Sequence, residues 1–132
     1  VEQNIEKFGS AKRQFLNADV VTVPAPNGDL ILCREMLFHL SLEDGIAALQ
    51  NMLASGCSYL LLTTDRATSF NAQVDSGDFR LINLERRPYR LPEPIEKIED
   101  DVVSKGRFIG LWRAEQVQKA LGLDKIAVSS LI

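Results

Sequence analysis

The first candidates for chemistry in this sequence are polar side chains in and beside a long irregular stretch. Residues 65–79 are rich in Asp, Ser, Thr, Asn and Gly and follow neither a helical nor a strand period, a pattern typical of functional or mobile loops. Arg80 and Asn83 come directly after it, and a guanidinium and an amide can orient an anionic or polar substrate. We therefore treat four residues as substrate-binding candidates: Asp65, Asn71, Arg80 and Asn83.

Other reaction chemistries have little support. His39 is the only histidine and lies in an apolar stretch, which is more typical of a packed or capping residue than of a general base. Without a Gly-x-Ser-x-Gly elbow, a Ser-His-Asp hydrolase is disfavoured. Cys33 and Cys57 each lie beside an apolar run and form no metal-ligand spacing. We expect both to be reduced, buried thiols, and we predict no metal site.

Charge and hydropathy narrow the range of partners. Fifteen Lys and Arg against 18 Asp and Glu give a net charge of -3, so the chain offers no basic field for a nucleic acid backbone. Its apolar runs are too short to span a bilayer, and the N-terminus has no signal-peptide pattern. We expect a cytoplasmic protein with neither nucleic acid nor membrane as a partner.

A small basic cluster interrupts this acidic background. Acidic residues flank its members, which favours a solvated mixed-charge face over an anion-binding patch. The arginines are Arg86, Arg87 and Arg90, and the flanking acids are Glu85, Glu93 and Glu96.

The elements that must position these residues follow an α/β pattern. Length and composition suit one globular domain. Ser41 begins a helix with apolar residues at intervals of four and three, and Gly56 follows as a C-terminal cap. The predicted helices are 1–8, a turn within 34–40, 42–53 and 114–121; the predicted strands are 13–19, 29–33, 59–63, 95–98, 107–112 and 126–128.

Two of these strands flank the best-defined helix. Residues 29–33 and 59–63 are continuous apolar runs, which predicts strands covered on both faces. A strand, a helix and a strand in this order form a βαβ unit with parallel strands and a right-handed crossover. Residues 95–98 and 107–112 are expected to pair as an antiparallel hairpin.

Several segments together resemble the class I S-adenosylmethionine-dependent methyltransferases. The most specific is residues 29–40, Asp-Leu-Ile-Leu-Cys-Arg-Glu-Met-Leu-Phe-His-Leu. The others are 15–19, 59–64, 77–80, 83–84, Pro88, 91–92, Pro94 and 110–112. The resemblance implies a partial Rossmann-like methyltransferase sheet, a parallel βαβ unit plus a C-terminal antiparallel hairpin, with flanking helices. In the family, the seven strands run in the order 3-2-1-4-5-7-6, and the last is antiparallel.

The resemblance also implies roles for individual residues. Asp19 matches the acidic residue that hydrogen-bonds the adenine amino group of S-adenosylmethionine. Cys33, Arg34 and Glu35 match the segment after the fourth family strand, which lines the methionine end of the cofactor. Asp65 falls at the corresponding edge after the fifth family strand. The implied reaction is methyl transfer from S-adenosylmethionine to an acceptor that is either a small molecule or of unknown kind.

One family feature is absent from this chain. The eight glycines form no Gly-x-Gly, so the glycine-rich turn that holds the cofactor is missing, and so is the carboxylate that grips the ribose. We expect residues 1–132 to form a single, truncated methyltransferase-like α/β domain, the C-terminal part of a longer parent. Such a domain should be inactive or bind the cofactor weakly on its own.

Loss of the first two family strands would leave an open sheet edge beside residues 29–33. Open edges recruit another strand. We expect either the N-terminal segment to cover this edge or two copies to form a homodimer through it. The alternative function is a non-catalytic interaction module that uses the edge or the 65–94 loop.

Overall fold

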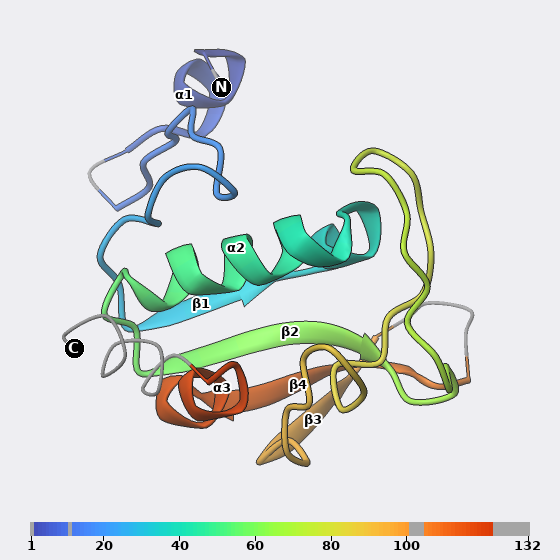
Figure 1. The fold of residues 1–132 in the computed structure, drawn as a ribbon. Coiled ribbons are helices and arrows are strands. Elements are labelled where there is room, and N and C mark those ends of the chain that lie inside the picture. Colours follow the sequence, from blue (N-terminus) through green and yellow to red (C-terminus); the bar gives the residue numbers. More distant parts are fainter. Residues whose placement is uncertain (1, 11, 101–104, 123–132) are drawn as a thin grey trace, which may run out of the picture.

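A computed structural model of the protein describes residues 2–10, 12–100 and 105–122. They form a mixed α/β fold, which confirms the coarse fold class (Figure 1). The helices are α1 (Glu2–Phe8), a short 3₁₀-helix (Met36–His39), α2 (Leu42–Leu53) and α3 (Ala114–Ala120). The strands are β1 (Leu30–Cys33), β2 (Tyr59–Asp65), β3 (Glu96–Glu99) and β4 (Arg107–Arg113).

One sheet joins the four strands in the order β1-β2-β4-β3. β1 and β2 are parallel, with Leu30 opposite Tyr59, and β4 is antiparallel to both of its neighbours. The predicted parallel βαβ unit and the predicted hairpin are therefore confirmed. β4 lies between β2 and β3, so the long segment after β2 passes over to the far edge of the sheet before the chain returns to the centre.

The helix α2 forms where its local signals indicate. The Ser41 hydroxyl accepts a hydrogen bond from the backbone N–H of Asp44 at 3.1 Å, which caps the first turn. Leu49 and Met52 are buried on the face that packs on the sheet. After the helix, Gly56 adopts φ +77°, a left-handed conformation that glycine reaches without steric cost.

The core lies between the sheet and the layer formed by α2 and α3, which are on the same side of the sheet in Figure 1. Leu60, Leu62 and Trp112 of the two central strands are fully buried there with Val117 of α3. The opposite face of the sheet is much barer. Its exposed apolar residues are Leu30, Leu32, Tyr59 and Ile98. The fold is thus a two-layer arrangement, with helices on one side of the sheet.

Two expectations about strands are wrong. Residues 13–19 form no strand; Arg13 makes one isolated bridge with Ser10, and no described strand lies beside this segment to complete a ladder. β1 is not covered on both faces, because it is an edge strand with Leu30 53% and Leu32 60% exposed. The predicted strand 126–128 lies outside the described residues.

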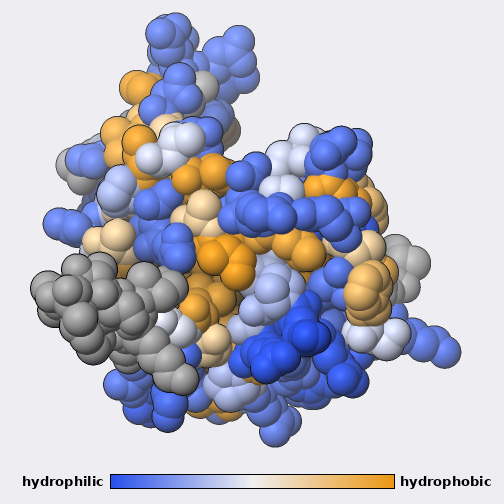
Figure 2. All heavy atoms as spheres, viewed as in Figure 1, coloured by the Kyte–Doolittle hydropathy of each residue, from blue (hydrophilic) through white to orange (hydrophobic). Residues whose placement is uncertain are grey.

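The N-terminal helix α1 contributes little to this core. None of its residues is buried, and Ile5 and Phe8 are both about half exposed. Figure 2 shows hydrophilic residues dominating this projecting part, while hydrophobic residues are exposed across the middle of the face. Among the described residues, no helix is long and apolar enough to cross a membrane.

Candidate functional site

The carboxyl ends of the parallel strands β1 and β2 bring two predicted site segments together. Cys33, the last residue of β1, lies opposite Leu62 of β2. Beyond it, the backbone N–H of Glu35 donates a 2.9 Å hydrogen bond to Oγ1 of Thr63. Both segments therefore meet at the carboxyl ends of the strands, which is where ligands bind in open α/β sheets.

Glu35 is held at this edge by an ion pair. Its backbone has φ +64°, an uncommon left-handed conformation for a side chain of this size. Its Oε1 lies 2.8 Å from Nη1 of Arg107 at the start of β4. The Arg107 side chain is only 9% exposed, and its guanidinium lies 5.0 Å from the centre of the Phe38 ring. Glu35 thus neutralises a nearly buried cation.

Arg34 faces a different partner. Its guanidinium donates two hydrogen bonds to the carboxylate of Asp100, at 2.7 and 3.0 Å, in a bidentate pair. The Asp100 side chain is nearly buried, whereas that of Arg34 is half exposed. This pair ties the loop after β1 to the residue that follows β3.

Cys33 points into the protein. Burial raises the pKa of its thiol to about 11, against weaker opposing hydrogen bonds from the backbone of Leu37 and Met36. The group is therefore a protonated thiol at neutral pH, and it is a poor nucleophile there.

A pocket of about 420 Å³ lies beside the outer edge of β1. Its walls are mostly apolar, and of the described residues that line it Arg34 alone is charged. The lining residues are Val20, Ala25, Pro26, Ile31, Leu32, Cys33, Arg34, Met36 and Met52. Asp19 precedes Val20 in a turn, where its carboxylate accepts the backbone N–H of Val21 at 3.0 Å. Cys33 and Arg34 thus line this pocket, Asp19 adjoins it in sequence, and Glu35 is directed to Arg107 instead.

The candidate substrate residue Asn71 is the centre of a hydrogen-bond latch inside the long loop. Its side-chain NH₂ donates to the carbonyl oxygens of Asn83 at 2.9 Å and Arg87 at 2.7 Å, and its Oδ1 accepts the N–H of Asn83 at 2.8 Å. The Asn83 side chain in turn donates to the carbonyl oxygen of Thr68 at 2.9 Å. The two buried amides hold the arms of the loop together.

The side chains of Asp65 and Arg80 also form hydrogen bonds within the protein. The Asp65 carboxylate, buried at the end of β2, accepts the hydroxyl of Thr68 at 2.7 Å. Arg80 donates to the carbonyl oxygens of Ala72 at 2.7 Å and of Leu37 at 3.1 Å. Desolvation lowers the pKa of this guanidinium, and its Nη2 is buried without a described partner. Asp65 thus binds a loop hydroxyl, and Arg80 joins the loop to the 3₁₀-helix. A contact of either side chain with substrate stays a prediction.

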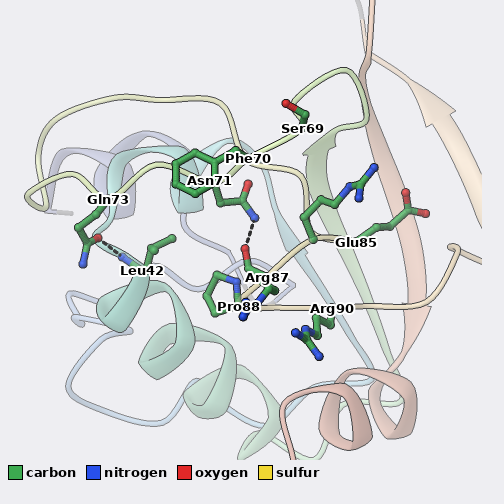
Figure 3. A pocket seen from close by; sticks show the side chains of 10 residues that line it. Leu42, Ser69, Phe70, Asn71, Gln73, Glu85, Arg87, Pro88 and Arg90 are labelled. Carbon is green, nitrogen blue, oxygen red and sulfur yellow. Dashed lines mark hydrogen bonds between the residues drawn. The ribbon is translucent and has the colours of Figure 1, made fainter.

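A second pocket, of about 780 Å³, lies between this loop and the start of α2 (Figure 3). The sequence does not single out this pocket, because acidic residues flank its three arginines and therefore indicate a solvated face. The only available signal was the cluster itself. The lining residues are Leu42, Ser69, Phe70, Asn71, Gln73, Glu85, Arg86, Arg87, Pro88 and Arg90.

The described part of the chain contains no group of three His, Cys, Asp or Glu side chains that could hold a metal ion. No family model, curated protein or solved structure matches the chain.

Proposed function

We propose that this chain supplies the strands that class I methyltransferases number four to seven, and with them one edge of an S-adenosylmethionine site. The observation that carries the proposal is the sheet order β1-β2-β4-β3 with β4 antiparallel to its neighbours. In the family order this corresponds to 4-5-7-6, with the reversed strand in the same place. Sequence resemblance and strand order are separate kinds of support, because the first concerns side chains and the second concerns connectivity.

The pocket beside β1 suits one end of the cofactor. Its apolar walls can hold an adenine ring. Asp19 precedes the lining residue Val20 in sequence, and we assign its carboxylate as the acceptor for the exocyclic amine. Bound S-adenosylmethionine would supply the methyl group. No Gly-x-Gly turn is present in the chain, so we assign adenine binding to these residues and assign them no transfer step.

Calorimetric titration with S-adenosylhomocysteine and S-adenosylmethionine tests this assignment. We expect saturable binding that Asp19→Ala weakens about tenfold or more, the loss typical of one charge-assisted hydrogen bond. Asp29→Ala is the matched control, because it removes an exposed carboxylate at the opposite end of β1. Absence of heat at millimolar ligand, or equal losses in the two variants, would remove the cofactor role.

Self-association is a second candidate function, favoured by the outer edge of β1. No strand among the described residues pairs with this edge, and the apolar side chains of Leu30 and Leu32 are exposed beside it. Unpaired apolar edges recruit a further strand. The occupant we propose is β1 of a second copy.

Symmetry specifies the register of such a pair. A two-fold axis perpendicular to the sheet and passing between two copies of Ile31 makes the strands antiparallel. It sets Leu30 of one copy opposite Leu32 of the other, on the same face, as cross-strand pairing requires. The two four-stranded sheets would then join into one.

Light scattering after size-exclusion chromatography, at several protein concentrations, measures the molar mass and so tests whether two copies pair through β1. We expect a dimer that Leu32→Lys converts to a monomer, because a charge beside an edge opposes pairing. Ile98→Lys is the control, since Ile98 is similarly exposed but lies on β3 at the other edge of the sheet. A monomeric wild type, or a dimer that survives Leu32→Lys, would refute this second function.

A further inference from the structure

The 780 Å³ pocket of the long loop is large enough for a small organic ligand. Figure 3 shows its walls coming from separate parts of the chain: Phe70 and Asn71 from one arm of the loop, Arg87 and Pro88 from the other, and Leu42 from the start of α2. It shares no lining residue with the pocket beside β1. Its properties can therefore be tested apart from the proposed cofactor site.

The charge of this pocket is positive, although the chain as a whole carries -3. Arg86, Arg87 and Arg90 line it, and none of their guanidinium groups has a hydrogen bond or ion pair with another described residue. The one acidic residue in the lining, Glu85, is neutralised by Arg66, whose Nη2 lies 3.0 Å from its Oε1. Three exposed guanidiniums thus remain available for an anion.

The turn that carries the arginines is fixed before any ligand arrives. The N–H groups of Tyr89 and Arg90 both donate to the carbonyl oxygen of Arg86, at 3.1 and 3.0 Å. Tyr89 is fully buried below the turn, and Asn71 binds the carbonyl oxygen of Arg87 at 2.7 Å. Arg90 has φ +52°, an uncommon conformation for a non-glycine residue. A preorganised turn loses little conformational entropy on binding.

Apolar surface adjoins these charges. Phe70 is 76% exposed, more than any other large hydrophobic residue in the part of the chain that the structure describes, and Pro88 lies in the facing wall. An exposed aromatic ring beside guanidiniums favours a ligand that carries both a planar apolar group and a negative charge, because the ring stacks while the arginines bind the oxyanion. We propose that this pocket binds a small aromatic oxyanion, with a phosphate or carboxylate held by the arginines and a ring held by Phe70.

Calorimetry with phenyl phosphate, benzoate and inorganic phosphate tests the site. We expect phenyl phosphate or benzoate to bind the wild type more tightly than inorganic phosphate does, and the tighter of the two identifies the oxyanion. Arg87→Gln and Arg90→Gln should each weaken that ligand about tenfold, the loss of one charge-assisted contact. Arg13→Gln, the same change at an exposed arginine outside the pocket, is the control and should leave affinity unchanged.

The variant Phe70→Ala separates the contribution of ring stacking to affinity from that of the arginine charges. It should weaken binding of the aromatic oxyanion and leave the affinity for inorganic phosphate unaltered. Circular dichroism of each variant shows whether the fold is retained. Three results would overturn the proposal: absence of saturable heat with both aromatic ligands, equal binding by wild type and the triple variant R86Q/R87Q/R90Q, or tighter binding of a polyglutamate peptide than of either aromatic ligand.

Discussion

The backbone N–H of Glu35 donates to Oγ1 of Thr63 across 2.9 Å, a bond between the segments that follow β1 and end β2. This bond holds the loop after β1 against the carboxyl end of its neighbouring strand β2. The ion pair of Glu35 with Arg107 adds the start of β4 to the same edge. Three strands are thereby connected at the end of the sheet where the candidate residues gather.

The Glu35–Arg107 pair should contribute measurably to stability. Arg107 is nearly buried and Glu35 is 35% exposed. Glu35→Gln therefore removes the negative charge that pairs with the Arg107 guanidinium, and little water can reach that guanidinium to compensate. A double-mutant cycle of Glu35→Gln and Arg107→Gln should give a coupling energy of about 2 kcal/mol in urea unfolding.

The pair Arg66–Glu85 serves as its control. It is also an Arg–Glu pair, with two hydrogen bonds where Glu35–Arg107 has one, and its side chains are 38% and 23% exposed. Its coupling energy should be below about 1 kcal/mol. Equal coupling in the two cycles would show that burial does not distinguish them.

Asn71→Ala should destabilise the protein by about 3 kcal/mol, measured as the free energy of unfolding in urea. The substitution removes three hydrogen bonds and leaves the buried N–H of Asn83 without an acceptor. Asn27→Ala, in an exposed loop, should change stability by less than about 0.5 kcal/mol. A loss as small as that of the control would show that the latch is dispensable.

Stability should fall above pH 9 because of Cys33. Its thiol has a pKa of about 11 when folded and an ordinary pKa of 9.0 when unfolded. Between these values the unfolded chain releases a proton that the folded chain retains, so rising pH favours unfolding. From pH 8 to 10.5 the wild type should lose about 2 kcal/mol more than Cys33→Ala does.

The same two proteins provide an internal control below pH 8. There the thiol is protonated in both states, so the difference in unfolding free energy between wild type and Cys33→Ala should be constant with pH. Parallel pH profiles throughout would contradict a buried, protonated thiol.

Gly45→Ala should destabilise the wild type although it raises helix propensity. A Cβ at this position of α2 would lie 2.6 Å from the hydroxyl oxygen of Tyr89, which is buried without a described partner. Tyr89→Phe removes that hydroxyl. In the Tyr89→Phe background, Gly45→Ala should therefore stabilise the protein by up to about 1 kcal/mol, the propensity difference between the two residues. Thermal unfolding of the four proteins measures the reversal.

Local signals predicted the regular elements well. The Ser41 cap, the apolar spacing of α2 and the left-handed Gly56 are properties of adjacent residues, so they can be identified without knowledge of the fold. β1 and β2 were likewise predicted as parallel strands. The prediction that β1 is covered on both faces is wrong, because a run of apolar residues does not reveal whether the strand lies in the centre or at an edge of its sheet.

The candidate site was harder to predict for the same reason. Asn71 and Arg80 are polar residues in a loop, and only the folded structure shows that they bind carbonyl groups of that loop. The partner of Glu35 is 72 residues away in sequence, at Arg107. The acidic residues beside Arg86 indicate a solvated face when the sequence is considered alone. The pocket also depends on Phe70, which the hydrogen bonds of Asn71 hold near these arginines.

The placement of β4 between β2 and β3 also has a kinetic meaning. Asp65 at the end of β2 pairs with Arg107 at the start of β4, so residues 66–106 form a closed loop. Closing about forty residues costs roughly 3 kcal/mol in chain entropy before the strands can pair. During synthesis, β1 can pair with one edge of β2, but the other edge has no partner until residues 107–113 emerge from the ribosome. We expect folding to be rate-limited by this closure and the nascent chain to depend on chaperones until then.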